Sequence, residues 1–185
     1  YVVAGRPIHP QRPLAVGPLM ARGTWGHHQS GRFSGKMICL SSMLDEAAYP
    51  WQAAWYQRQV RAARGERTGE HHRLWFVEHA MHGPSAPVAV HGDEAWPSPL
   101  TRTVPYVGVL EQAIRDVIAW VEHDIPPAPD TQFDLVDAQV MVSGTATTRG
   151  GIQPTVRLTA NGRDRVDVGV GEEIVFVGEA DVPPG

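Results

Sequence analysis

An aspartate and a histidine, residue types that work together in acid–base catalysis, each follow a short apolar run at the same distance. Asp45 lies five residues after Met37-Ile38-Cys39-Leu40, and His82 lies five residues after Leu74-Trp75-Phe76-Val77. A carboxylate hydrogen-bonded to an imidazole fixes its tautomer and stabilises the imidazolium that forms when the ring takes a proton from a serine. In such a pair Asp45 is the orienting acid and His82 is the base.

The elements that carry these residues are typical of a parallel α/β sheet. Continuous apolar runs of this length fit strands that are buried on both faces. Between the runs, Pro50 begins a predicted helix of about four turns, and Gly65 falls beyond its end. Strands joined by a helix in one sheet have a right-handed crossover, so both end at the same edge. We therefore expect neighbouring parallel strands and an Asp45–His82 hydrogen bond, whereas a separation beyond about 6 Å favours a non-catalytic protein.

A second helix is predicted between Pro105 and Pro126-Pro127. Its apolar positions recur at helical spacing, at Leu110, Ile114, Val117 and Val121. Two strands do not make a stable parallel sheet alone, so the other strands are expected upstream of Tyr1. The chain starts without Met or a signal segment and ends in a loop-like stretch, and we treat it as an excerpt of a longer protein. Four tryptophans are expected to pack in the core: Trp51, Trp55, Trp75 and Trp120.

After Pro129 the pattern changes to short β-like runs, first at residues 133–136 and 140–142. From residue 152 onward, apolar and polar residues alternate, which indicates strands with one buried face. These strands are expected at residues 156–160, 166–170 and 174–177. Asn161-Gly162 and Gly171 supply the turns. The pattern predicts an antiparallel β-sandwich that is only partly present in this chain.

Each member of the pair has an alternative at this stage. Asp45 is also in a position to cap the helix that begins near Pro50, because aspartate is common at such sites. Glu46 is the substitute acid, and His79 is the rival base.

The nucleophile that such a pair would serve is missing from the sequence. In α/β-hydrolases the order is Ser, then Asp or Glu, then His, and the Ser lies in a Gly-x-Ser-x-Gly turn between a strand and a helix. That motif is absent from the chain. The candidate serines have the wrong flanking residues: Ser30, Ser34, Ser41 and Ser42. We expect the nucleophile to lie upstream.

Composition excludes several other functions. The 185 residues carry 16 Lys and Arg against 20 Asp and Glu, a net charge of -4, without a basic block, so nucleic acid is not an expected partner. The single cysteine, Cys39, excludes a disulfide framework and a cysteine zinc site. Adjacent histidines in an extended chain point apart, so His27-His28 and His71-His72 predict no metal site, and no cofactor is expected. No apolar run is long enough to span a bilayer.

A resemblance to bacterial α/β-hydrolases runs through the same residues. Its first part is Gly35-Lys36-Met37-Ile38, Met43-Leu44-Asp45 and Pro50-Trp51-Gln52-Ala53-Ala54-Trp55-Tyr56. Its second part is Arg73-Leu74-Trp75-Phe76-Val77 and His79-Ala80-Met81-His82-Gly83. Over roughly residues 20–130 this order is similar to the end of tannase- and feruloyl-esterase-like enzymes. The resemblance implies a serine hydrolase that cleaves a small-molecule ester, with Asp45 as acid and His82 as base.

The tail resembles the opening strands of PKD-type immunoglobulin-like modules, through Pro154-Thr155-Val156 and residues 166–176. Such modules are usually extracellular, which implies a secreted or otherwise extracytoplasmic protein. The resulting plan is the C-terminal portion of an α/β-hydrolase domain over residues 1–130, a β-rich linker over 131–151 and the start of an Ig-like domain over 152–185. The alternative function is a non-catalytic extracellular binding or adhesion protein on a degenerate hydrolase scaffold.

Overall fold

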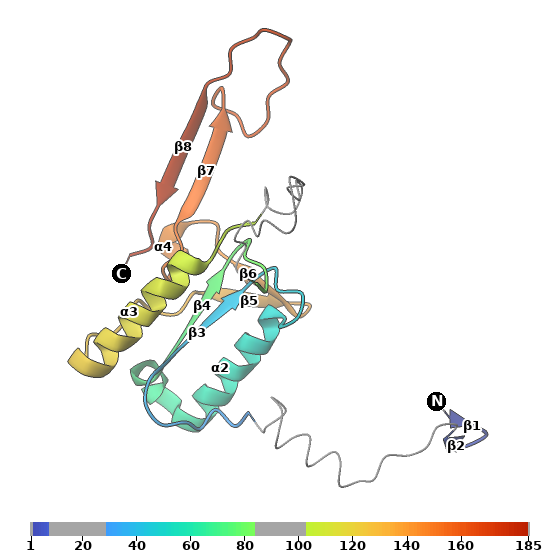
Figure 1. Cartoon of the computed structure of the whole chain (residues 1–185), viewed down its shortest axis with the longest axis vertical. Helices are drawn as coiled ribbons and strands as arrows, with labels where there is room; N and C mark the ends of the chain where they lie inside the picture. The colour runs from blue at the N-terminus through green and yellow to red at the C-terminus, as the bar shows by residue number, and fades with distance from the viewer. Residues whose placement is uncertain (1, 8–28, 84–102, 185) are drawn as a thin grey trace, which may run out of the picture. The chain divides into compact units, whose positions relative to one another are not determined.

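The computed structural model describes residues 2–7, 29–83 and 103–184, and the chain divides into two units, Tyr1–Ser30 and Gly31–Gly185 (Figure 1). In the first unit, strands β1 (Val2–Val3) and β2 (Arg6–Pro7) form a short antiparallel pair. The pair His27-His28 lies outside the described residues. All elements discussed below belong to the second unit.

The two apolar runs form neighbouring parallel strands, as predicted. Strand β3 (Met37–Ser42) pairs with β4 (His72–Val77), and the register runs from Met37 opposite His72 to Ser42 opposite Val77. The arrows of both strands point to the same end in Figure 1. Helix α2 (Pro50–Arg64) and the 3₁₀ helix η1 (Gly65–Glu70) connect them. Helix α2 begins at Pro50 and ends before Gly65, which confirms the predicted crossover helix.

Strand β4 is the buried centre of this unit. Leu74, Trp75, Phe76 and Val77 are at most 2% exposed. Leu74 and Phe76 pack with Ala54 of α2 in one apolar cluster. Burial of each large apolar side chain contributes roughly 1.5–3 kcal/mol, so this strand supplies much of the stability of the pair.

A β-hairpin extends the same core. Strands β5 (Phe133–Val136) and β6 (Gln139–Val142) are antiparallel and are followed by helix α4 (Ala146–Arg149). The ring of Phe133 meets that of Phe76 edge-on at 5.0 Å, and Val140 joins the apolar cluster. Asp130 accepts the backbone N–H of Leu74 at 2.8 Å. Residues 130–142, most of which were expected to be a linker, therefore pack on β4 and α2.

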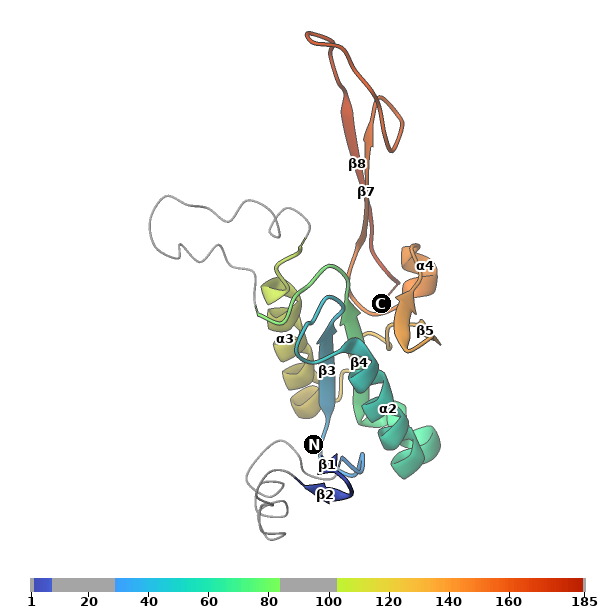
Figure 2. The same ribbon diagram turned by 90° about the vertical axis from the view of Figure 1, so that its right-hand side faces the viewer.

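Helix α3 (Val107–His123) follows the predicted bounds, and it lies on the other side of the strand pair from α2 (Figure 2). Its buried residues are Ala113 and Trp120. The Lys36 ammonium donates to the Trp120 carbonyl at 2.6 Å, which complements the negative end of the helix dipole. Of the predicted apolar positions, Leu110, Ile114 and Val121 are exposed and Val117 is half-buried. The exposed apolar stripe of α3 is 41–61% exposed and consists of Val107, Leu110, Ile114, Ile118 and Val121.

The expectation for the tryptophans was right for two and wrong for two. Trp75 and Trp120 are buried, whereas Trp51 is 43% and Trp55 38% exposed. Both exposed rings lie on α2, whose buried residues are Ala54, Gln57 and Val60. Ala54, Gln57 and Val60 are spaced three apart and form the face of α2 against the strands, whereas Trp55 lies off this face and Trp51 lies in the first turn of the helix.

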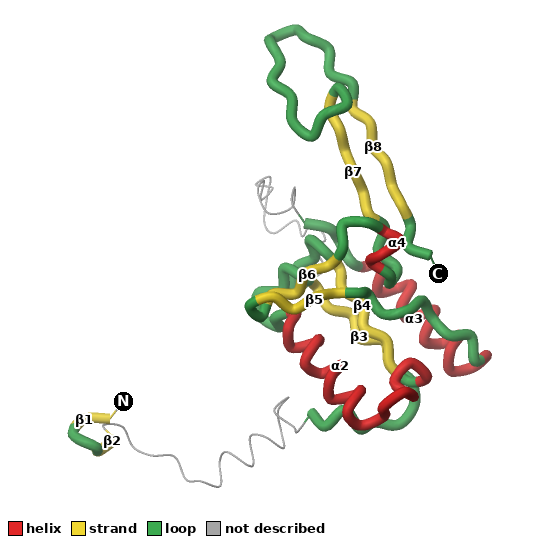
Figure 3. Tube along the Cα trace, turned by 180° about the vertical axis from the view of Figure 1, so that it is seen from behind, coloured by secondary structure: helices red, strands yellow, loops and turns green. Residues whose placement is uncertain are grey.

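The β-rich tail forms one hairpin, of β7 (Thr155–Ala160) and β8 (Phe176–Asp181) (Figure 3). Asn161 and Gly162 have positive φ, in agreement with the predicted turn. The strand expected at residues 166–170 was wrong, and the run expected at 174–177 begins two residues later. An alternating segment forms a strand only where a neighbouring strand pairs with its backbone N–H and C=O groups. Residues 166–170 have no such neighbour in the described structure, and Val170 is fully exposed.

The buried histidine of β4 makes the stability of this unit depend on pH. His72 is 1% exposed, packs near the rings of Phe33 and Tyr56, and has two ring nitrogens without a hydrogen-bond partner in the described structure. Burial lowers the pKa of the His72 imidazole. The unfolded chain therefore binds a proton at His72 that the folded chain resists. The contribution of His72 to stability is thus full above its ordinary pKa of about 6.5 and is lost as the pH falls through that value toward the lower folded pKa.

We predict that His72→Leu reduces this loss. The measurement is urea unfolding of both proteins at pH 7.5 and pH 5.5, and the result expected is a smaller drop in unfolding free energy for the variant. An equal drop in the two proteins would assign the acid sensitivity to other groups.

Candidate active site

The parallel register brings the two chemical side chains together. Because Ser42 and Val77 are paired at the ends of β3 and β4, the loops that follow leave at one edge of the sheet. Two backbone bonds tie these loops to each other, from Met43 N–H to the Val77 carbonyl and from Leu44 N–H to the Ala80 carbonyl, both 2.9 Å. The expected meeting of the aspartate and the histidine is confirmed.

The contact is a hydrogen bond between the Asp45 carboxylate and the His82 imidazole. Nδ1 of His82 lies 2.9 Å from Oδ1 and 3.0 Å from Oδ2 of Asp45. The Asp45 side chain is 11% exposed and that of His82 is 55% exposed. The Asp45 carboxylate is thus held inside its loop, while the His82 ring extends toward solvent.

Asp45 is fixed by its own loop as well as by His82. Its Oδ1 accepts the backbone N–H groups of Ala47 at 2.8 Å and Ala48 at 2.7 Å. Burial of the carboxyl opposes ionisation, but the hydrogen bonds from Ala48, Ala47 and His82 outweigh it, and the pKa of Asp45 lies below its ordinary value. Asp45 is therefore a carboxylate at neutral pH.

The contacts around Asp45 also decide between the two alternatives, which were a helix-capping role for Asp45 and Glu46 as the acid. Helix α2 has Tyr49 at its N-cap and no side-chain cap, so Asp45 stabilises the turn before the helix rather than the helix itself. Glu46 accepts the backbone N–H of His82 at 3.4 Å, whereas the His82 ring contacts the Asp45 carboxylate. Asp45 is the carboxylate that meets the imidazole.

His82 is also held through its backbone. The Tyr106 hydroxyl donates to the His82 carbonyl at 3.1 Å, from the residue that precedes α3. The hydrogen bond and the negative charge of Asp45 raise the pKa of His82 above the value of a free imidazole. The sequence pattern did not single out Tyr106; its one signal was a position directly after Pro105, at the start of a helix that follows the histidine loop.

The rival base, His79, has a different place in the loop. Its φ of 57° puts it in the left-handed region, and its carbonyl accepts the N–H of Val104 at 2.8 Å. The chain turns at His79 and returns toward β3, so that His82 is the histidine that reaches Asp45.

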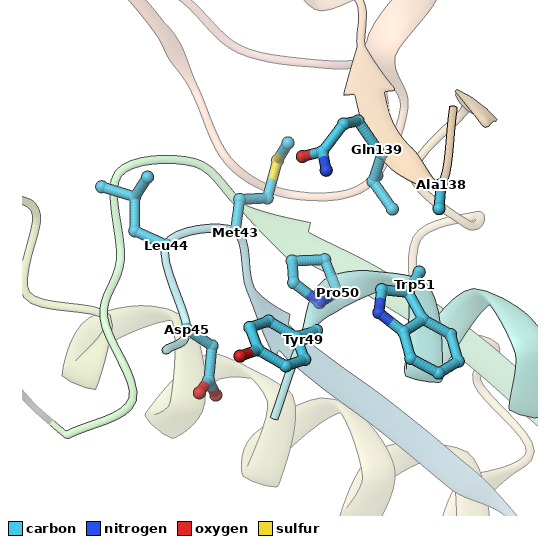
Figure 4. A pocket seen from close by; sticks show the side chains of 9 residues that line it. Met43, Leu44, Asp45, Tyr49, Pro50, Trp51, Ala138 and Gln139 are labelled. Atoms are coloured by element: carbon cyan, nitrogen blue, oxygen red, sulfur yellow. The ribbon is translucent and has the colours of Figure 1, made fainter. Parts of the chain in front are cut away.

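Two hollows border the pair. One, of about 410 Å³, is lined by Asp45 and His82, by Ser41 and Ser42 of β3, and by Tyr106. The other, of about 430 Å³, lies along the Asp45 loop. Figure 4 places Tyr49, Pro50 and Trp51 along one wall of the second hollow, with Met43 and Gln139 along the facing wall.

The remaining reactive groups are poorly suited to chemistry here. Cys39 lines the first hollow, but burial raises the pKa of its thiol to about 11, so it is not a thiolate nucleophile. The His71 ring contacts the Gly35 carbonyl at 3.0 Å, while the His72 side chain is buried near the ring of Phe33, so the two histidines have different surroundings. Within the described ranges, three or more His, Cys, Asp and Glu side chains do not gather into a metal site.

We predict that Asp45→Asn lowers the pKa of His82, because the variant lacks the negative charge that stabilises the imidazolium. The measurement is an NMR titration of the His82 ring, with Asp124→Asn as the matched control, because Asp124 pairs with Lys36. The stabilising contribution of the Asp45–His82 pair should be full below the ordinary histidine pKa of about 6.5 and be lost as the pH rises through the raised folded pKa of His82. A His82 titration that is the same in both variants would contradict the pairing.

Comparison with protein-family models, curated proteins and solved structures finds no match for this chain. Among the helices that the structure describes, none has both the length and the apolar character of a membrane span. The functional assignment therefore depends on the residues themselves, and above all on the hydrogen bond between Asp45 and His82 at the end of two parallel strands.

Proposed function

We propose that this chain supplies the acid and the histidine of a serine-hydrolase-type carboxylic ester hydrolase. The observation that carries the proposal is the 2.9 Å contact between Asp45 Oδ1 and His82 Nδ1, made by loops from adjacent parallel strands. A carboxylate on Nδ1 leaves Nε2 as the ring atom that exchanges protons with the reacting groups. The non-catalytic alternative has two marks, a large separation of the two side chains and the lack of a serine turn upstream, and the observed distance favours the enzyme on the first of them.

In the proposed reaction, Nε2 of His82 takes the proton of a serine hydroxyl as the serine oxygen bonds to the ester carbonyl carbon. The imidazolium then gives this proton to the alcohol oxygen as the C–O bond breaks, which leaves an acyl-serine. A water, deprotonated by the same imidazole, attacks the acyl carbon, and the serine recovers its proton as the acid departs. Asp45 stays ionised and stabilises the imidazolium in both halves.

The open side of β3 supports a nucleophile that comes from further strands. One edge of β3 is paired with β4, and no described strand lies on its other edge. The first hollow borders β3 and the pair, and the exposed stripe of α3 contributes Leu110 to its lining. Additional parallel strands on this edge would cover the stripe and place a strand-to-helix serine turn beside His82.

The finer fold and the location belong to the same proposal. The strand pair with α2 and α3 on its two sides fits the C-terminal part of an α/β-hydrolase sheet. On one face of the tail hairpin Val156, Leu158 and Phe176 are exposed apolar residues, which fits the start of an immunoglobulin-like sandwich. Such a module favours an extracytoplasmic protein.

In the intact protein, we predict hydrolysis of a p-nitrophenyl ester and labelling by a serine-directed fluorophosphonate. His82→Gln should lower kcat by at least about 10³-fold and abolish labelling, because the serine loses its base. The matched control is His123→Gln, an exposed histidine at the end of α3 that should leave both readouts unchanged. Intact protein that neither hydrolyses esters nor reacts with the probe would end the proposal.

The pH profile gives an independent check. Because the pKa of His82 is raised, kcat/KM should rise with pH through a pKa above that of a free imidazole. Asp45→Asn should lower kcat by roughly 10³–10⁴-fold, since the ring loses its preferred tautomer. An acidic limb at the same pH in an active His82 variant would show that another group is the base.

A further inference from the structure

We propose that Arg149 and Gln153 are positioning residues for His82, acting through Glu78, and we call these three residues the Glu78 clamp. The inference rests on the proposed function of His82 as a base. It adds residues from the segment after β6, which was expected to be a linker or the start of an accessory domain, to the machinery that places the base.

The first half of the clamp is a side-chain amide that replaces a missing strand neighbour. Glu78 is the first residue after β4. Its N–H donates to Oε1 of Gln153 at 2.7 Å, and its carbonyl accepts from Nε2 of Gln153 at 3.2 Å. One glutamine thus satisfies both backbone groups of Glu78, as the next strand of a ladder would, and fixes the direction in which the chain leaves β4.

The second half is an ion pair between a buried arginine and the Glu78 carboxylate, whose side chain is 33% exposed. The Arg149 guanidinium donates to the Glu78 carboxylate, and its Nε donates to the Ser143 carbonyl at 2.7 Å. The Arg149 side chain is 5% exposed. A guanidinium at this depth needs its partners, because an unpaired buried charge is strongly unfavourable. The Glu78 side chain is therefore held in one place relative to α4.

The histidine loop needs such support because it begins with a strained turn. His79, directly after Glu78, is a non-glycine residue with a φ of 57°, a conformation that L-residues seldom adopt. From this turn the chain passes Ala80, whose carbonyl accepts the N–H of Leu44, and reaches His82. Release of Glu78 frees the turn to relax, and the imidazole then moves away from Asp45.

The decisive experiment compares Gln153→Ala with Gln132→Ala in the intact protein. Gln132 is the matched control because its side chain also bonds a backbone carbonyl, that of Asp130 at 3.1 Å, but does not contact the histidine loop. We expect Gln153→Ala to lower kcat by about 10–100-fold with little change in KM, as a misplaced base would. The acidic limb of kcat/KM and the NMR titration of the His82 ring should both move to lower pH, and the control should leave all readouts unchanged.

A second variant keeps the test decisive if Gln153→Ala does not fold. Arg149→Lys retains the positive charge, but a lysine ammonium cannot reproduce the planar guanidinium that bonds both the Glu78 carboxylate and the Ser143 carbonyl. It should move the same readouts in the same direction. Folded variants with an unaltered His82 titration and pH profile would overturn the clamp. Loss of folding in both variants, with Gln132→Ala intact, would also overturn it, because the residues would then serve stability alone.

The outcomes separate the clamp from the enzyme proposal. If the intact protein hydrolyses no ester, yet Gln153→Ala shifts the His82 titration, the clamp stands and the proposed reaction fails. If ester hydrolysis requires His82 but neither clamp variant alters its titration, the reaction stands and the clamp fails.

Discussion

Ser42 and Val77 face each other at the ends of two parallel strands, and the loops that carry the candidate chemistry depend on this register. A shift by one residue would move one loop by about 3.3 Å along the sheet and turn its side chains to the other face. That displacement exceeds the 2.9 Å contact between Asp45 and His82. The buried residues of β4 hold the register, because Leu74 and Phe76 fit the cluster with Ala54 only on the face where they now lie.

The Asp45 carboxylate is oriented by its own loop as well as by His82. Two backbone N–H groups already hold the Asp45 carboxylate in one orientation. The same carboxylate also forms a hydrogen bond with Nδ1 of His82. The Tyr106 hydroxyl binds the backbone carbonyl of His82, and the Glu46 carboxylate binds its backbone N–H. Donors and acceptors fixed in this way do not have to reorganise when the imidazolium forms, which is the main source of electrostatic stabilisation in such sites.

Local patterns in the sequence were sufficient to predict the strand–helix–strand unit and the contact between Asp45 and His82. The apolar runs, Pro50 and Gly65 each specify a local structure, and the crossover rule converts their order into a shared edge. The patterns failed where a neighbour decides the outcome. Trp51 and Trp55 have the composition of core residues but lie on the exposed side of α2. Residues 166–170 alternate like a strand but have no partner strand, and Gln153 meets Glu78 across a long stretch of chain with no local signal of that contact.

The described residues place the pair without help from a nucleophile. Among the described residues, the hydrogen bonds to Asp45 and His82 come from the loops after β3 and β4 and from Tyr106. A serine brought to the unpaired edge of β3 would therefore meet an imidazole whose tautomer and direction are already set. Leu110 of the α3 stripe lines the same hollow as Asp45 and His82, so strands that covered this residue would also border the reaction site. The stability gained by covering Leu110 and Ile114 would then help to hold the nucleophile in place, which links assembly of the sheet directly to assembly of the reaction site.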